Sequence, residues 1–321
     1  MKKRVITGIL LAIILIPLLI VRSLFPLLQC VITLFCVVAT VEMIHMVEKT
    51  KPMKTGVKII VIISTLLIYF GIVNEDPTCK QSLIYKFMAS FDFKLSILTT
   101  LTIACALVFA CQIFVKDFDA ADVGRCFMII LYISLGFSSL TILLFNGRRF
   151  IIYMFLIAIL TDIFALVFGL NFGKHKMCPT ISPKKTWEGA IGGTAVAVLV
   201  GSLFAIFYHY FGHFFVIGAD VKPIYFFEGV FDLNKMPKVG LVFFIIFLSI
   251  MISIASQIGD LICSKFKRTY GIKDFSQVFP GHGGILDRFD STIFASIVFL
   301  CFLTIVRIAF DLPEFALWMK L

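Results

Sequence analysis

The chain has 321 residues, of which 60% are hydrophobic and 15% charged, with a formal net charge of +10 and a mean hydropathy of +1.04. Soluble globular domains are about half apolar and about one quarter charged. The composition therefore excludes a soluble globule and predicts an all-α polytopic membrane protein.

Nine apolar runs are long enough to cross about 30 Å of hydrocarbon as helices, which satisfy their own backbone hydrogen bonds there. The runs are 5–21, 25–47, 57–73, 95–115, 123–145, 150–170, 190–217, 239–258 and 290–310. They divide the chain into an N-terminal transmembrane region of five spans, 1–150, and a C-terminal transmembrane region, 151–321. No internal repeat of the kind that builds inverted-repeat transporters is visible.

The first run follows the basic sequence MKKR and resembles a secretory signal, but it is long and no small-residue cleavage site follows it. We interpret it as an uncleaved first span with a cytoplasmic N-terminus. In this orientation most of the 29 Lys and Arg residues lie on the cytoplasmic side, in agreement with the positive-inside rule.

Two polar groups stand out in the N-terminal region. Glu42 and His45 lie three residues apart near the inner end of the second run, so they share a helix face. They can make a polar contact inside the bundle or snorkel to the interface, and we favour snorkelling. The acidic loop 116–122, KDFDAAD, can hold a cation through its three Asp residues, but such a charge run more often marks a solvated face. The nine cysteines form no CxxC pair or Cys/His cluster, so neither a disulfide framework nor a zinc site is expected.

The sixth run contains one carboxylate, Asp162, with apolar residues on both sides. A charged group in the bilayer is costly, so it indicates by default a functional role and a partner. We expect that partner among the basic residues of the loop 171–189.

This loop, NFGKHKMCPTISPKKTWEG, leads into the seventh span. Ser182 is a candidate helix cap followed by a proline near the first helical position. A helix N-terminus beside Lys184 and Lys185 is suited to bind an anion. The structural alternative is a positive-inside anchor, with Trp187 in the interfacial belt. The loop alone leaves these two interpretations open.

The stretch 256–290 gathers charges that are scarce elsewhere in the chain. Asp260 lies at the predicted mouth of the eighth span, and Asp287 and Asp290 lie at the mouth of the ninth. Such oxygen ligands suit a hard cation. The chain between them supplies cations suited to phosphate oxygens, namely Lys265, Lys267, Arg268 and Lys273. The segment PGHGG can turn tightly and lets the backbone approach a ligand. Together these parts indicate phosphoryl-group chemistry, in which the protein mainly positions groups and neutralises charge.

The same stretch resembles the signature of a known family, the phosphatidate cytidylyltransferases or CDP-diacylglycerol synthases. The matching run is Ser264-x-Phe266-Lys267-Arg268-x4-Lys273-Asp274-x-Ser276-x2-Phe279-Pro280-x-His282-Gly283-Gly284-Ile285-x-Asp287-Arg288-Phe289-Asp290. A second block, from Thr161-Asp162 to Trp187-Glu188-Gly189, is similar to another segment of the family. The two blocks cover roughly 161–290. The chain departs from the family pattern at Leu166 and at Gly169-Leu170, where relatives often carry Tyr and Gly-Arg.

The resemblance implies that CTP and phosphatidate react to give CDP-diacylglycerol and pyrophosphate, a step of phospholipid biosynthesis. It implies dependence on Mg²⁺, with a second, monovalent cation also conceivable, and an active site on the cytoplasmic face of the cell membrane. It further suggests a homodimer and gives no reason to expect a nucleic-acid partner.

The resemblance also implies roles for individual residues. The implied catalytic residues are Lys267, Arg268, Lys273, Asp274, His282 and Arg288. The implied substrate-binding residues are Asp162, Ser182, Lys184, Lys185, Trp187, Glu188, Gly283 and Gly284. The implied metal ligands are Asp260 and Asp287, with Asp290 as a third candidate. For His282 we favour a role in ordering the Gly loop over direct donation to a phosphate.

Three other functions are compatible with parts of the sequence. A cation-coupled transporter would use Asp162 and Asp260 to bind its ion, but it leaves the basic loops and PGHGG unexplained. A CDP-alcohol phosphatidyltransferase would carry an Asp-Gly motif followed by Ala-Arg, which is not found. A degenerate scaffolding member of the family is opposed by the intact signature.

Overall fold

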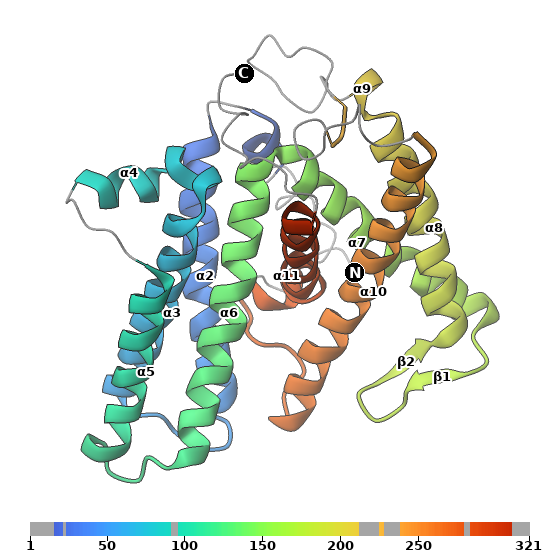
Figure 1. Ribbon diagram of the computed structural model, residues 1–321. Helices are drawn as coiled ribbons and strands as arrows, with labels where there is room; N and C mark the ends of the chain where they lie inside the picture. Colours follow the sequence, from blue (N-terminus) through green and yellow to red (C-terminus); the bar gives the residue numbers. More distant parts are fainter. Residues whose placement is uncertain are drawn as a thin grey trace. The chain divides into compact units, whose positions relative to one another are not determined.

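The computed structural model describes residues 16–21, 24–90, 96–211, 225–227, 238–278 and 283–309 (Figure 1). These residues form helices with one small hairpin. The elements in chain order are α2 (Phe25–Val47), α3 (Thr55–Glu75), η2 (Pro77–Gln81), α4 (Leu83–Ser90), α5 (Ile97–Phe114), α6 (Ala120–Asn146), α7 (Arg148–Phe172), β1 (Lys176–Cys178), β2 (Ser182–Thr186), α8 (Trp187–Ile206), α9 (Tyr208–Phe211), α10 (Lys238–Thr269) and α11 (Leu286–Ala309).

Eight of the described helices are long and apolar enough to cross a membrane, namely α2, α3, α5, α6, α7, α8, α10 and α11. They coincide with eight of the nine predicted runs. The remaining run, 5–21, falls mainly outside the described residues. The prediction of an all-α polytopic membrane protein is therefore confirmed.

The chain divides into two compact units, each built from segments that are distant in sequence. The first unit includes the described parts of Leu24–Ile142 and Lys267–Phe289. The second includes those of Leu143–Phe266 and Asp290–Leu321. The segment 267–289 therefore folds with the N-terminal helices, although it comes late in the chain.

In the first unit, a buried tyrosine joins three helices. Tyr69 on α3 is fully buried, and its hydroxyl lies 3.3 Å from the Thr33 hydroxyl of α2 and 3.0 Å from the Thr141 hydroxyl of α6. Helices α3 and α5 pack side by side (Figure 1), and Gly71 lies directly against Thr100. Hydrogen bonds between helices and close approach at small residues both favour association in a membrane.

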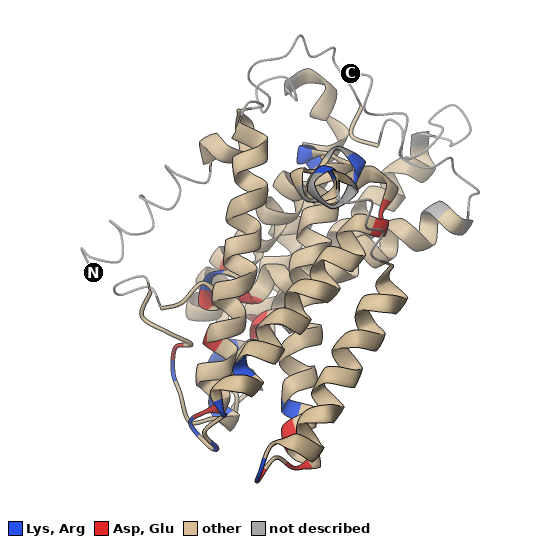
Figure 2. Ribbon diagram, turned by 90° about the vertical axis from the view of Figure 1, so that its left-hand side faces the viewer, with Lys and Arg blue, Asp and Glu red and all other residues tan. Residues whose placement is uncertain are grey.

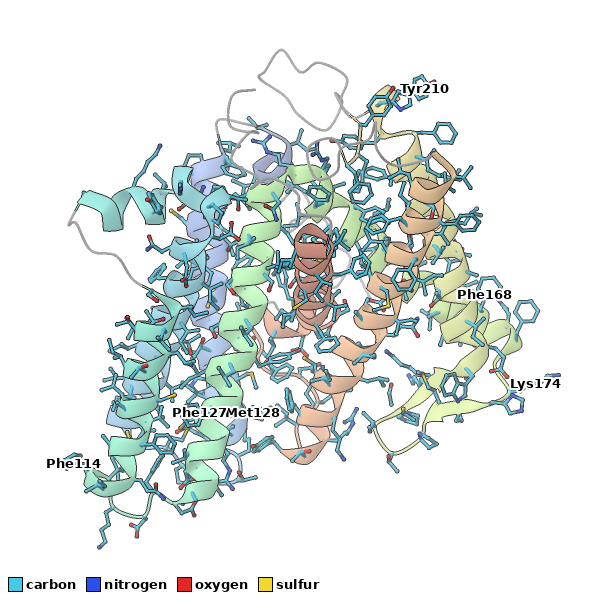
Figure 3. The ribbon with its side chains drawn as sticks, viewed as in Figure 1. Phe114, Phe127, Met128, Phe168, Lys174 and Tyr210 are labelled. Carbon is cyan, nitrogen blue, oxygen red and sulfur yellow. The ribbon has the colours of Figure 1, made fainter. Side chains whose placement is uncertain are left out.

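In the second unit, α7 and α8 form the closest helix pair. Small residues recur on α8 at every fourth position, at Gly189, Gly193, Ala197 and Gly201. A Cβ atom at Gly193 would lie only 2.6 Å from the carbonyl oxygen of Thr161 on α7. At Gly192 the equivalent space is taken by the ring of Phe168, whose place on α7 is labelled in Figure 3. This stripe of small residues allows the two backbones to approach closely.

The connection from α7 to α8 is a two-stranded antiparallel hairpin in which Lys176 pairs with Thr186 and Cys178 with Ser182. Helix α8 begins at Trp187, and the side chain of Thr186 accepts the hydrogen bond from the Gly189 N–H. The prediction that Ser182 caps this helix is therefore wrong. Cross-strand pairing holds Ser182 in β2, so the residue that ends the strand provides the cap.

Helix α10 extends to Thr269, eleven residues beyond the predicted end of the apolar run at 258. Asp260 consequently lies within the helix and not at its end, which corrects the predicted placement. The last turn carries Lys267 and Arg268, whose charges are favourable at a helix C-terminus.

Candidate active site

The charged residues of the described helices lie mostly near helix ends and connections, while the helix middles are largely uncharged (Figure 2). In a membrane protein this pattern keeps charge in or near the aqueous interface. Asp162, well inside α7, is an exception.

In the second unit, Lys185 and Asp260 form an ion pair. Lys185 lies on β2, and its Nζ is 2.5 Å from Asp260 Oδ2 on α10. The other oxygen of this carboxylate accepts a hydrogen bond from the Ser264 hydroxyl at 3.3 Å. Both charged side chains are 26% exposed. One predicted phosphate-binding lysine therefore contacts one predicted metal ligand.

The intramembrane Asp162 belongs to the same group. Its carboxylate hydrogen-bonds the buried Ser291 on α11 and interacts electrostatically with Lys185 and Asp260. The expectation that the partner of Asp162 comes from the basic loop after α7 is therefore supported by Lys185.

A row of polar side chains on α10 supports this group. Ser253 and Gln257 follow one another at four-residue spacing and face α7 and α8. The Ser253 hydroxyl lies 2.8 Å from that of Thr161, and Gln257 Nε2 donates to Thr194 at 2.8 Å. Sequence reasoning missed these residues, although their spacing within an apolar run was a usable signal. Such interhelical bonds fix the helix whose next turn carries Asp260.

In the first unit, Lys267 and Asp287 form a second pair, which is more buried. Lys267 Nζ lies 2.8 Å from Asp287 Oδ1, with the two side chains 12% and 4% exposed. The second oxygen of Asp287 accepts hydrogen bonds from the backbone N–H groups of Phe275 at 2.8 Å and Gly284 at 2.9 Å. The Lys267 ammonium also lies 5.2 Å from the centre of the Phe275 ring, within the range of a cation–π contact.

Glu42 is the principal residue that sequence reasoning misjudged. It is 2% exposed on α2, so the favoured interpretation, snorkelling to the interface, is wrong. Its carboxylate accepts hydrogen bonds from the Ser276 hydroxyl at 2.6 Å and from the N–H groups of Ile285 at 2.9 Å and Leu286 at 2.8 Å. The N-terminal helices thus contact the signature directly.

The paired glycines of the signature have separate structural reasons. Gly283 adopts φ +82°, which favours glycine, and a Cβ atom there would lie 2.7 Å from Asp287 Oδ2. Gly284 lies directly against the Glu42 carboxylate, so any side chain would collide with it. The backbone at these glycines was expected to approach a ligand closely. In the structure it lies close to two carboxylates of the protein, those of Asp287 and Glu42.

A cavity of about 600 Å³ lies in the first unit, between the end of α2 and residues 272–277. Lys273 and Asp274 line it from the signature, His45 lines it from α2, and Lys49 lines it from the turn after this helix. Its volume is within the usual range for small-molecule sites.

The remaining predicted residues are divided between the two units. In the second unit, Lys184 and Trp187 are exposed, and Glu188 contacts His175, with Nδ1 to Oε1 at 2.6 Å. Asp290 accepts a hydrogen bond from the N–H of Ser291, its neighbour in sequence. In the first unit, Arg268 and Arg288 are exposed. His282 lies outside the described residues.

The acidic loop 116–122 is tied to a neighbouring connection. Lys51 lies 3.2 Å from Asp119 and also contacts Asp122, which pairs with Arg125 at 2.5 Å. Two of its three carboxylates are thus neutralised by cations of the protein.

The donor chemistry of the predicted metal ligands fits Mg²⁺, which prefers oxygen. A carboxylate offers about four acceptor positions. Among the described residues, two donors reach Asp260 and three reach Asp287, so both keep acceptor capacity. Within either unit, the described part holds no group of three or more His, Cys, Asp and Glu arranged as a metal site. Asp260 and Asp287 belong to different units, and the metal set remains a prediction.

Comparison with known proteins gives one family. A model described as the cytidylyltransferase family matches residues 2–306. Proteins named phosphatidate cytidylyltransferase from Staphylococcus haemolyticus and Staphylococcus aureus (strain COL) are each 37% identical over 177 residues, and one from Staphylococcus epidermidis is 36% identical over the same length. Each alignment covers 55% of this chain and 57% of the relative. The chain thus spans a little over half the length of these relatives.

Proposed function

The chain belongs to the cytidylyltransferase family, and on this basis we propose that it is a phosphatidate cytidylyltransferase, which converts CTP and phosphatidate to CDP-diacylglycerol and pyrophosphate. The observation that carries the proposal is the meeting of Lys267 and Asp287 within the first unit, where Gly283 and Gly284 lie against the carboxylates of Asp287 and Glu42. The names of the relatives support the choice of substrates.

The reaction is a substitution at the α-phosphorus of CTP. A phosphate oxygen of phosphatidate attacks the α-phosphorus and forms the new P–O bond. The bond from the α-phosphorus to the oxygen that bridges to the β-phosphorus breaks, and pyrophosphate leaves with the electron pair. The phosphatidate headgroup is a phosphate monoester with a second pKa near 6, as in phosphoserine, so it is largely ionised at neutral pH. The main obstacle is therefore the repulsion between a dianion and a triphosphate.

The residues of this chain can reduce that repulsion with fixed positive charge. Lys267, Lys273 and Lys185 lie beside carboxylates or a cavity, where an ammonium can bind phosphate oxygens of either substrate. Arg268 and Arg288 are exposed and can bind the leaving pyrophosphate. Pairing with Asp260 and Asp287 keeps Lys185 and Lys267 oriented.

A Mg²⁺ ion, when bound, supplies electrostatic stabilisation of the charge that develops on the phosphate oxygens. Asp260 and Asp287 would hold it, with Asp290 as a third ligand. A bound monovalent cation and a homodimer are further parts of the proposal that rest on the family resemblance alone.

The substrates differ in how they reach the site. CTP is soluble in water and phosphatidate lies in a leaflet, so the reaction belongs at the membrane interface. We assign this interface to the cytoplasmic face of the cell membrane, because the positive-inside rule, applied to the sequence, makes the basic loops 171–189 and 256–290 cytoplasmic.

The test is release of pyrophosphate from CTP by the full-length protein purified in detergent. Release is expected only when phosphatidate and Mg²⁺ are both present, and EDTA should abolish it. A folded protein that releases no pyrophosphate under any of these conditions would contradict the proposal, and transport would then be tested as substrate flux in liposomes.

Two conservative variants test the metal ligands in the same assay. Asp260→Asn and Asp287→Asn each remove a negative charge while keeping the size of the side chain, and each should abolish Mg²⁺-dependent turnover without preventing membrane insertion. Asp117→Asn is the matched control, because Asp117 has φ +64°, a conformation that Asn tolerates, and lies outside the proposed site. Turnover near wild type in either site variant would refute that metal assignment.

A further inference from the structure

Glu42 is a buried carboxylate that accepts hydrogen bonds from three groups of the signature segment. Ser276, Ile285 and Leu286 donate to it at 2.6, 2.9 and 2.8 Å, across 234 to 244 positions of sequence. Buried polar groups are costly unless hydrogen-bonded, and hydrogen bonds to a charged acceptor are roughly twice as strong as neutral ones. These three contacts therefore hold the segment firmly to α2.

Two of these donors belong to the start of α11. Helix α11 begins at Leu286, and the first N–H groups of a helix have no partner within the helix. A carboxylate at this end is also favoured by the helix dipole. Glu42 thus acts as a cap supplied by a different helix, and the first turn that it caps carries Asp287.

The contacts of Asp287 tie the two carboxylates into one arrangement. Asp287 accepts the N–H of Gly284, and Gly284 lies against Glu42. Asp287 also accepts the N–H of Phe275, while the hydroxyl of the next residue, Ser276, donates to Glu42. A shift of the segment away from Glu42 would therefore move the backbone that orients Asp287.

The same segment forms one wall of the cavity. Lys273 and Asp274 lie just before the residues that Glu42 and Asp287 hold. The opposite wall is formed by His45 at the end of α2 and by Lys49 in the turn that follows. Glu42 lies on that same helix, one turn before His45. The two walls of the cavity are thus joined through Glu42.

We infer that Glu42 is a positioning residue for nucleotidyl transfer, which fixes the signature segment so that Lys267, Lys273 and Asp287 face their ligands. The inference rests on the proposed function and assigns a role to the N-terminal helices in it. Glu42 does not act on substrate itself.

The test compares Glu42→Gln with Gln29→Leu in the full-length protein in detergent. In Glu42→Gln the new amide keeps one acceptor oxygen but turns an N–H donor toward the segment, so the capping contacts are lost in part. Gln29 is the matched control, because it lies on the same helix, is 2% exposed and accepts the N–H of Leu83 at 2.9 Å, outside the signature. Ser276→Ala is a milder variant that removes one donor to Glu42.

Hydrogen–deuterium exchange and kinetics are measured on all three variants. For Glu42→Gln we expect faster exchange of the Ile285, Leu286 and Gly284 amides, and a kcat lower by about 10²-fold, as for small misplacements of catalytic groups. The KM for CTP should change by less than about threefold, because no substrate contact is removed. Gln29→Leu should keep the wild-type kcat, even if its thermal midpoint falls as far as that of Glu42→Gln. Ser276→Ala should show a smaller loss of kcat than Glu42→Gln. The double variant Glu42→Gln/Ser276→Ala should lose less than the two single effects combined, because both changes remove the same contact.

The exchange measurement separates failure of this inference from failure of the proposed function. Wild-type exchange in the signature segment of the Glu42→Gln protein, or an equal loss of kcat in Gln29→Leu, would overturn the positioning role. If Glu42→Gln does not fold, Ser276→Ala tests the positioning role instead, through the exchange of the signature amides and through kcat. If the wild-type protein releases no pyrophosphate, the proposed function is refuted and the kinetic test no longer applies. Wild-type exchange of the signature amides in Glu42→Gln would then still refute the positioning contact.

Discussion

Lys267 and Asp287 meet in the first unit at a distance of 2.8 Å, the lysine in the last turn of α10 and the aspartate in the first turn of α11. Each is at a favourable helix end for its charge, the cation at a C-terminus and the anion at an N-terminus. Because both side chains are nearly buried, removal of either one leaves a charge without compensation in a poorly solvated place.

We expect Lys267→Met to destabilise the protein by about 3 kcal/mol, as when one partner of a buried pair is lost, and to abolish pyrophosphate release. Lys265→Met is the control, because Lys265 is exposed on the same helix and should lose less than about 0.5 kcal/mol. Thermal unfolding in detergent measures both. Addition of Asp287→Asn to Lys267→Met should restore part of the stability but no activity. Equal stability of the single and double variants would contradict the assignment of this pair.

Gly284→Ala should disturb the signature through Glu42. The new methyl group would run into the buried carboxylate, so we expect at least a tenfold loss of kcat and a destabilisation of about 1–3 kcal/mol from overpacking. Gly124→Ala is the control in the same assays. Apart from the backbone of α6 itself, a methyl group at Gly124 would have no atom of the described residues within 4 Å. Ala in a helix interior is also favoured over Gly by about 0.5–1 kcal/mol. A fully active Gly284→Ala enzyme would show that this contact is dispensable.

The spans could be predicted from the sequence because hydrophobic length is a local property. Eight runs matched eight helices for this reason, although α10 continues past its apolar run to Thr269. The end of α10 was missed because the polar residues after 258 were assigned to a loop, whereas helical hydrogen bonds extend through them. The cap at Thr186 was missed because pairing of β2 with β1 competes with helix formation at Ser182.

The candidate site was only partly predictable. The spacing of Lys267, Gly283 and Asp287 marked the signature, since these residues lie close together in sequence. Glu42 could not be connected to them, because its partners lie more than 230 positions away and nothing in local spacing encodes that contact. The position of Glu42 within an apolar run was a weak indication that its side chain is buried. The run ends near the predicted interface, however, and this favoured the wrong interpretation of snorkelling.

Acidification should loosen the connections of the first unit. A backbone hydrogen bond from Asp122 and the Lys51 ammonium lower the pKa of Asp119. Burial raises the pKa of Glu48, but hydrogen bonds from Lys58 and from the Met53 N–H outweigh it, so the pKa is lowered overall. Because each folded pKa lies below its unfolded value, the stabilisation is complete above the unfolded pKa of about 4. It is lost as the pH falls through the folded pKa.

Hydrogen exchange can follow this loss at single amides. The protection of the Met53 N–H, which donates to Glu48, should be constant from pH 7 to about 5 and decrease below about 4. The Leu98 N–H donates to the Ser96 hydroxyl, which does not titrate, and its protection factor should stay constant over the same range. Lys58→Met should move the loss of Met53 protection to higher pH. Parallel loss at Met53 and Leu98 would indicate general acid unfolding instead.

Cys178 offers a direct test of the orientation in the membrane. It lies on β1 of the hairpin that follows α7, which we expect on the cytoplasmic side, and its side chain is partly exposed. Cys79 follows the third predicted span, so a cytoplasmic N-terminus puts it on the opposite side. It is buried, and burial raises the pKa of its thiol, so it should react slowly. Cys30 and Cys301 are also exposed, so both are first replaced by Ser. In that protein a membrane-impermeant maleimide should label inverted vesicles and not intact cells, and Cys178→Ser should remove the label. The reagent reaches only the outer face of intact cells, so labelling of Cys178 there would contradict the proposed orientation. The hairpin and Lys185 would then lie on the side of the membrane away from cytoplasmic CTP.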